Sequence, residues 1–184
     1  MRCARIYQFH PAKIPVVNYQ GLMEVHTRWT RKQGDGPTYG ECVRTAWLES
    51  RSLNGIICLE HDIAVSRECW RELGDFVVRY PQDVAAVPYL LYPRSTGRDA
   101  AAWAHRSSVT DGQYLFVPAS APPPSHPSAF GLGCTYLPGR LLDAMPDDLG
   151  HWDYPVLDTR LSDLARELSI PCRCTPTAAI HLHY

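Results

Sequence analysis

An unbroken apolar run, Ile56-Ile57-Cys58-Leu59, is the feature that most constrains this fold. It is bounded by Asn54-Gly55 on one side and by Glu60-His61-Asp62 on the other. A strand with apolar side chains on both faces must be packed against other elements on both faces, which is typical of the centre of a parallel sheet. The run therefore predicts a fully buried central strand.

The segments around this strand alternate between strand and helix patterns. Period-two alternation predicts strands, and apolar residues three or four apart predict helices. Ser66 is the expected N-cap of the helix that ends at Pro81. The expected strands are 4–9, 22–29, 56–59 and 83–92, and the expected helices are 39–51 and the one that follows Ser66. This order predicts an αβα sandwich with a mostly parallel sheet.

Periodicity is lost from Pro93 to Pro127, a segment with isolated aromatics at Trp103, Tyr114 and Phe116. Long irregular stretches in compact domains are usually functional, so we expect a lid over the bound substrate. Trp103 is either a platform for a sugar ring or an anchor beneath the lid. The remaining expected elements are helices over 138–145 and 158–168 and a last strand over 177–183.

Composition limits the class of protein. A chain of 184 residues, 45% hydrophobic and 20% charged, is long enough for one domain with its own core. The formal net charge is −1 and lysine occurs only at Lys13 and Lys32, so no strong nucleic-acid binding is expected. There is no apolar leader and no run of eighteen apolar residues, which predicts a cytoplasmic protein without a membrane span. The seven scattered cysteines lack a C-x-x-C pair and indicate no disulfide framework.

Glu60 and Asp62 form an acidic pair directly after the central strand. Ligands of open α/β sheets bind beyond the carboxyl ends of the strands. Two carboxylates one residue apart suit Mn²⁺ or Mg²⁺ held together with substrate phosphates. An acidic residue at this place also caps the next turn, so the pair alone leaves both interpretations open.

The stretch TYGECVRTAWLESRSLNGIICLEHDIAVS resembles the GT-A glycosyltransferases, specifically the inverting family-2-type enzymes related to cellulose and chitin synthases. In that family a helix leads to a hydrophobic strand that ends in D-x-D, and here Glu60 replaces the first aspartate. The resemblance implies a GT-A-like (Rossmann-like) domain over 1–184, with a nucleotide-sugar-binding half, 1–92, and an acceptor-side half, 93–184. It also implies a UDP- or GDP-linked sugar donor, with the acceptor unknown.

The same resemblance implies roles for residues in the C-terminal half. The run Leu157-Asp158-Thr159-Arg160-Leu161 is similar to the family's E-D-x-D-L motif and places Asp158 as the base that deprotonates the acceptor. An Asp before an amphipathic helix is also a preferred N-cap, so both roles remain open. Asp153 is the second candidate for the base.

Further site residues are expected outside these two motifs. The family's late histidine corresponds to His181, with His183 second, so the expected metal ligands are Asp62, His181 and His183. Gly133 would let a bulky ligand approach the backbone, and Arg140 would pair with phosphate. The nucleotide-sugar contacts are expected at Glu60, Asp62, Arg31, Tyr39, Gly133 and Arg140.

Three other interpretations remain. A nucleotidyltransferase needs a similar acidic metal site, but it usually carries a glycine-rich phosphate loop after the first strand, and 9–13 contain no glycine. A zinc-binding module would use Cys172, Cys174, His181 and His183. A non-catalytic relative would bind sugars or proteins with the same fold.

Overall fold

The structure is a computed structural model that describes residues 4–10, 25–30, 36–92, 100–110, 113–153 and 156–182. Its elements are β1 (Ala4–His10), β2 (Val25–Trp29), α1 (Tyr39–Leu48), β3 (Gly55–Glu60), β4 (Ile63–Ala64), α2 (Arg67–Arg79), β5 (Val84–Ala86), β6 (Leu90–Leu91), β7 (Ala102–Thr110), β8 (Gln113–Pro118), β9 (Cys134–Pro138), α4 (Gly139–Asp143), α5 (Leu157–Glu167), β10 (Cys172–Cys174) and β11 (Ile180–His181).

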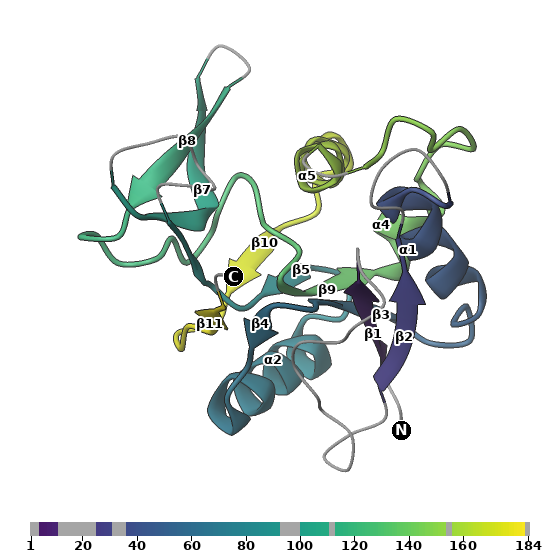
Figure 1. The fold of residues 1–184 in the computed structure, drawn as a ribbon, viewed down its shortest axis with the longest axis horizontal. Helices are drawn as coiled ribbons and strands as arrows, with labels where there is room; N and C mark the ends of the chain where they lie inside the picture. The colour runs from purple at the N-terminus through teal and green to yellow at the C-terminus, as the bar shows by residue number, and fades with distance from the viewer. Residues whose placement is uncertain are drawn as a thin grey trace.

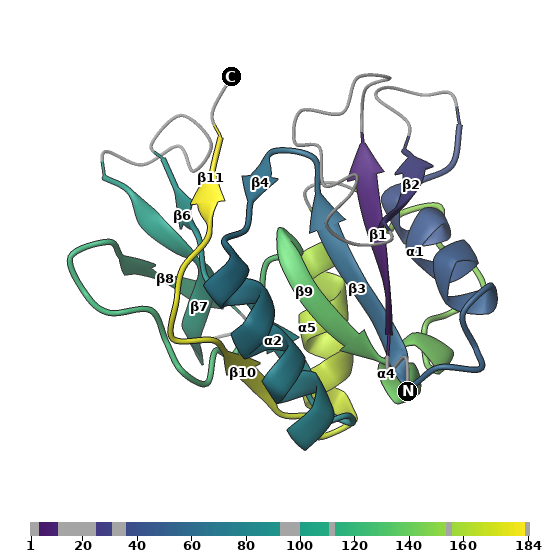
Figure 2. The same ribbon diagram turned by 90° about the horizontal axis from the view of Figure 1, so that it is seen from below.

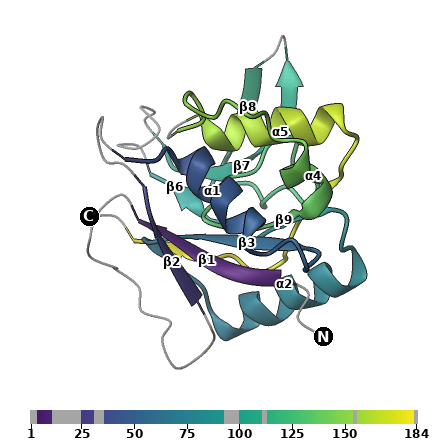
Figure 3. The same ribbon diagram turned by 90° about the vertical axis from the view of Figure 1, so that its right-hand side faces the viewer.

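A six-stranded sheet in the order β10-β5-β9-β3-β1-β2 forms the centre of the molecule. β1 is parallel to β2 and to β3, and β10 is parallel to β5. β9 lies between β3 and β5 and is antiparallel to both. Helices α1, α4 and α5 cover one face and α2 covers the other (Figure 3). The predicted α/β sandwich with a mostly parallel sheet is therefore confirmed.

β3 is buried on both faces, as its apolar run predicts. Ile56 and Cys58 belong to the core beneath α1, α4 and α5. Ile57 and Leu59 alternate with them and belong to the core that packs against α2. Because successive side chains of a strand point to opposite faces, this one short run contributes to both layers of the sandwich.

Local capping explains where the first two helices begin. Thr38 and Glu41 form a reciprocal capping box at the start of α1, in which the Thr38 side chain accepts a hydrogen bond from the Glu41 backbone N–H. Ser66 caps α2 as predicted, since its hydroxyl oxygen accepts the Cys69 N–H at 3.2 Å. No helix of the described residues has the length and apolar character that crossing a bilayer requires.

The strands of the C-terminal half differ from the sequence-based expectation. The predicted strand over 83–92 is two strands, because β5 belongs to the central sheet whereas β6 pairs with β7. Pro88, which has no N–H to donate, lies between them. The last strand is confined to Ile180–His181, which pairs with β4. β9 and β10 were not predicted, because each depends on a partner distant in sequence.

The prediction of an irregular lid over 93–127 is wrong for its described part. β7 and β8 form an antiparallel hairpin that projects from the body of the molecule (Figure 1). Two register shifts, one on each side of Arg106, break the period-two pattern and hide it from a periodicity search. The dipeptide Asp111-Gly112 stands between the two strands in the sequence and is a strong hairpin signal. The Trp103 indole N–H donates to the Ala121 carbonyl at 2.8 Å, which favours the anchor of the two alternatives.

Candidate functional site

The carboxyl ends of β1, β2 and β3 lie at one edge of the sheet (Figure 2). Glu60 is the last residue of β3, and its backbone N–H donates to the Gly133 carbonyl at 2.8 Å. Asp62 follows after one residue and lies directly before β4. The acidic pair is thus at the edge where open α/β sheets bind their ligands.

The charges of three carboxyl groups interact at this edge. Burial raises the pKa of Glu60 to about 8, and the nearby charges of Asp62 and Asp158 contribute in the same direction. Like charges raise the pKa of a carboxyl only when they lie close to it. The backbone contacts agree, because the loop before β9 joins both elements: the Phe130 N–H donates to the Ser162 Oγ of α5, and the Gly133 carbonyl accepts the Glu60 N–H.

Asp62 contacts His181, which β11 positions through its pairing with β4. The His181 Nε2 lies 3.1 Å from the Asp62 Oδ2. Burial raises the pKa of Asp62, but the hydrogen bond from His181 and the adjacent His61 outweigh it and hold that pKa below its ordinary value. The buried Oδ1 of Asp62 has no hydrogen-bond partner among the described residues and lies 3.9 Å from the His61 Nδ1.

These donors fit a divalent cation that is shared with a ligand. Carboxylate oxygen and imidazole nitrogen are both donors that Mn²⁺ accepts, and the Asp62 Oδ1 has its lone pairs unused. In the described part of the chain, however, no three His, Cys, Asp or Glu side chains gather into a metal site. The cation would therefore need phosphate oxygens to complete its coordination.

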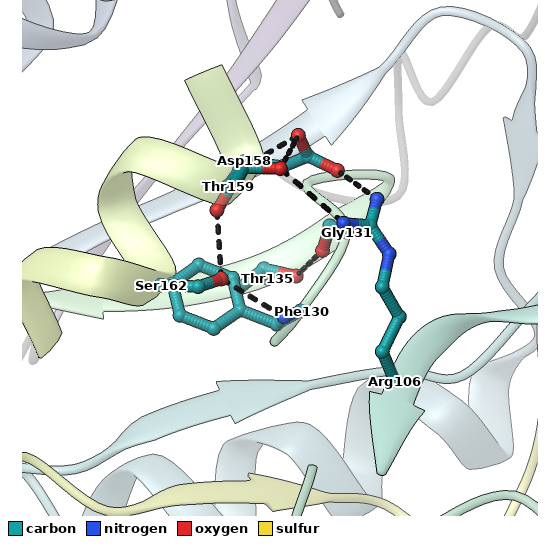
Figure 4. A network of polar contacts seen from close by, with 7 residues as sticks. All are labelled: Arg106, Phe130, Gly131, Thr135, Asp158, Thr159 and Ser162. Carbon is teal, nitrogen blue, oxygen red and sulfur yellow. Dashed lines mark hydrogen bonds and ion pairs between the residues drawn. The ribbon is translucent and has the colours of Figure 1, made fainter. Parts of the chain in front are cut away.

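Asp158 is held in place by two neighbours (Figure 4). Its Oδ1 accepts the Thr159 backbone N–H at 2.7 Å, and its Oδ2 pairs with the Arg106 Nη2 at 3.3 Å. Burial raises the pKa of Asp158 above its ordinary value, and Arg106 and Thr159 lower it in part. The N-cap of α5 is Val156, so the interpretation of Asp158 as the helix cap is wrong, although its carboxylate does satisfy one first-turn N–H.

Arg106 is a site residue that the sequence did not reveal. It extends from β7 toward α5, where its Nη1 also donates to the Thr159 Oγ1 at 3.2 Å (Figure 4). Its guanidinium lies 4.8 Å from the ring centre of Phe116 and 5.8 Å from that of Tyr114, both on β8. The Asp111-Gly112 dipeptide is the sequence signal that would have predicted the hairpin that carries Arg106.

Two buried tyrosines interact electrostatically with Glu60. Tyr39, the first residue of α1, is buried, and its hydroxyl has no hydrogen-bond partner among the described residues. Burial and the nearby Glu60 raise the pKa of both Tyr39 and Tyr89 well above the ordinary value. A Cβ added to Gly133 would lie 2.5 Å from the Tyr89 ring. The absence of a side chain at Gly133 therefore makes room for the Tyr89 ring. The glycine was predicted to make room for a ligand instead.

The other predicted residues have different partners in the structure. The Asp153 carboxylate accepts the Tyr39 backbone N–H at 3.1 Å and so fixes the start of α1. Pro138, the last residue of β9, pairs with Gly55 at the edge of the sheet opposite the acidic pair. Arg140 follows on α4 and donates a hydrogen bond to the Leu168 carbonyl. The predicted phosphate contact of Arg140 is therefore wrong. Arg31 and His183 lie outside the described residues.

The zinc interpretation is also unsupported by the described ligands. Cys172 and Cys174 lie on β10, which pairs with β5, whereas His181 pairs with Ile63 of β4. Burial raises the pKa of Cys174 to about 12, which disfavours the thiolate that zinc requires. Among the residues that the structure places, these three do not converge on one point.

His105 is a second buried group that the sequence did not single out. It is fully buried next to Tyr89, whose ring it meets edge-on at 5.6 Å between centroids. Neither ring nitrogen has a hydrogen-bond partner among the described residues. Burial, and then the neighbouring Arg106, lower the pKa of His105 to about 3. The imidazole is therefore neutral in the folded chain at physiological pH.

We expect this histidine to make stability depend on pH. The unfolded chain binds a proton at His105 near the ordinary pKa of 6.5, whereas the folded chain does not until about 3. Stability is thus fully present above 6.5 and is lost as the pH falls, by about 1.4 kcal/mol per pH unit. Urea unfolding of the wild type and of His105→Phe across this window measures the difference. The exposed His126, changed to Gln, is the control, and parallel curves for wild type and His105→Phe would contradict the prediction.

Comparison with known proteins shows the fold but no family. No family model and no curated protein matches the sequence. The structure is similar to the crystal structure of A197 from STIV, with a TM-score of 0.61 and 11% identity over 100% of this chain and 87% of that one. It is also similar to CMP:2-keto-3-deoxy-manno-octonic acid synthetase complexed with CTP, with a TM-score of 0.47 and 11% identity over 95% and 90% of the two chains. At such identities the likeness concerns the α/β fold alone.

Proposed function

We propose that this chain is a cation-dependent glycosyltransferase that moves a sugar from a nucleoside diphosphate to an acceptor hydroxyl with inversion. The observation that carries the proposal is the 3.1 Å contact between Asp62 and His181, beside a Glu60 whose pKa is raised by the charges of Asp62 and Asp158. These residues come from the ends of β3 and β11 and from α5, which are far apart in sequence. The same residues were expected, from the resemblance to GT-A enzymes, to act together.

The donor diphosphate would lie against Asp62 and His181. A divalent cation bound there would neutralise the negative charge that develops on the diphosphate as the sugar leaves. Asp62 offers the unpartnered Oδ1 to such a cation, and His181 holds the other oxygen of the same carboxylate. Glu60, which is half-buried, would hydrogen-bond a ribose or sugar hydroxyl.

Asp158 would act as the general base. The acceptor oxygen forms a bond to the anomeric carbon, and the bond between that carbon and the diphosphate oxygen breaks with its electron pair on the leaving group. The hydroxyl proton passes to an Asp158 carboxylate oxygen. Burial raises the pKa of Asp158, which makes its carboxylate a better proton acceptor than an exposed aspartate.

Nucleotidyl transfer is the alternative that requires the same cation and carboxylates. The synthetase among the similar structures is an enzyme named for a CMP product, which agrees with this alternative better than with glycosyl transfer. Its TM-score of 0.47 is too low for the likeness to decide the reaction. Both reactions use a nucleotide, and they differ in the phosphorus-containing product that is released.

The test follows that difference. The protein is incubated with Mn²⁺ and a panel of UDP- and GDP-sugars, and release of UDP or GDP is measured, including slow hydrolysis in which water replaces the acceptor. In parallel it is given nucleoside triphosphates with sugar acids, and pyrophosphate is measured. Glycosyl transfer predicts cation-dependent release of nucleoside diphosphate that EDTA abolishes. Pyrophosphate release instead would establish the alternative, and no product with either panel would contradict both.

A further inference from the structure

The β7–β8 hairpin reaches the candidate base through one side chain. Arg106 is the residue of β7 between the two register shifts of the hairpin, and its guanidinium contacts both Asp158 and Thr159 in the first turn of α5. The side chain is 15% exposed and that of Asp158 is 23% exposed, so the pair is largely withdrawn from solvent. An ion pair in such surroundings is screened much less than one on the surface.

The backbone of Arg106 is fixed by the loop that precedes β9. Its N–H donates to the Ala129 carbonyl at 2.8 Å, and its carbonyl accepts the Ser128 N–H at 2.7 Å. The next residue, Phe130, donates its N–H to the Ser162 Oγ, which in turn donates to the Asp158 carbonyl at 2.7 Å. The contacts thus close a ring that joins β7, the loop and α5 (Figure 4).

A second contact holds the hairpin against α5 one turn further along. The Tyr114 hydroxyl donates to the Asp163 carboxylate, and Arg166 bonds to both of them. The rings of Phe116 and Tyr114 flank the Arg106 guanidinium. Arg106 therefore approaches Asp158 from a backbone and a guanidinium that are both held by neighbours, which is what a group that orients another side chain needs.

We propose that Arg106 is the positioning residue for Asp158, which fixes the orientation of its carboxylate and keeps it ionised for proton abstraction. This inference rests on the proposed function, because it assigns Asp158 the part of the base. It makes the hairpin part of the catalytic apparatus. The hairpin then contributes to the reaction without touching the donor.

The charges around Asp158 support this role. Arg106 on β7 is the cation that lowers the pKa of Asp158, against the effect of burial. Glu60, at the end of β3, is another carboxyl group that interacts with Asp158, but its pKa of about 8 keeps it largely neutral near pH 7. On α5 itself, the Thr159 N–H and hydroxyl bond to the Asp158 carboxylate. Without Arg106, burial would favour the protonated acid, which cannot accept a proton.

The test compares Arg106→Gln with Arg166→Gln, which removes the α5 arginine that contacts the hairpin through Tyr114. The carboxyl titration of Asp158 is followed by ¹³C NMR in the cation-free protein, with Asp158→Asn to assign the signal. We expect the midpoint in Arg106→Gln to move to higher pH by about one unit, the usual effect of one close charge, and to stay unchanged in Arg166→Gln. An unchanged midpoint in folded Arg106→Gln overturns the inference.

Arg106→Lys separates the effect of Arg106 on the orientation of Asp158 from the effect of its charge. It also replaces Arg106→Gln as the test if that variant fails to fold. A lysine keeps the cation but cannot contact Asp158 and Thr159 together. We expect its titration midpoint to stay near that of the wild type while kcat falls about tenfold and KM is unchanged. A wild-type kcat in Arg106→Lys would overturn the orienting role. If no transfer is found with any donor, the proposed function fails, but the NMR titration still decides whether Arg106 controls Asp158.

Discussion

Replacement of Asp158 by asparagine is expected to lower turnover by about a hundredfold or more, the usual effect of removing a general base. The amide keeps the shape of the side chain and still accepts hydrogen bonds from Thr159 and Arg106, but it cannot take the acceptor proton. Donor binding should be retained, because Asp158 is not among the residues proposed to hold the diphosphate. Release of nucleoside diphosphate under saturating donor measures the effect.

The matched control for this variant is Asp163→Asn, one turn further along α5. Asp163 pairs with Arg166 and contacts the hairpin through Tyr114, so it shares the helix and the type of contact. We expect it to retain turnover. An equal loss of turnover in the two variants would mean that turnover depends on the packing of α5 and not on the Asp158 carboxylate. Retention of configuration in the product would also exclude direct displacement with Asp158 as the base.

Asp62→Asn is expected to abolish cation-dependent nucleotide binding. UDP or GDP at a hundredfold excess over Kd should stabilise the wild type by about 2.7 kcal/mol, and only when Mn²⁺ is present. The variant loses the carboxylate charge and with it the attraction to the cation and to His181. Thermal denaturation with nucleotide, in Mn²⁺ and in EDTA, gives the comparison.

Asp83→Asn provides the control, because Asp83 also forms a partly buried contact, with Arg173, at the β5 and β10 side of the sheet. It should lower stability but keep the shift that nucleotide and Mn²⁺ produce together. If the shift were the same in Mn²⁺ and in EDTA, or if Asp62→Asn retained it, the cation site would have to be abandoned.

The sequence alone determined the elements whose causes are local. Neighbouring residues determine the apolar run of β3, the Ser66 cap and the amphipathic faces of α1, α2 and α5. All of these features are present in the structure. The position of Glu60 and Asp62 at the carboxyl edge of the sheet follows from β3 alone. The late histidine was placed by resemblance, and β11 brings it to Asp62.

Only the tertiary structure decided the contacts that depend on distant partners. β9 and β10 are short strands that exist because β3 and β5 offer them unpaired edges, and five or fewer residues carry little periodicity. Arg140 seemed suited to phosphate, yet β9 runs antiparallel and takes it to the other edge. Arg106 meets Asp158 across 52 residues through a hairpin with an irregular register. Side-chain patterns indicate which face of an element is buried, but the packing of the whole chain determines which element it packs against. The acidic pair was therefore predictable from the sequence, whereas the contact of Arg106 with Asp158 was not.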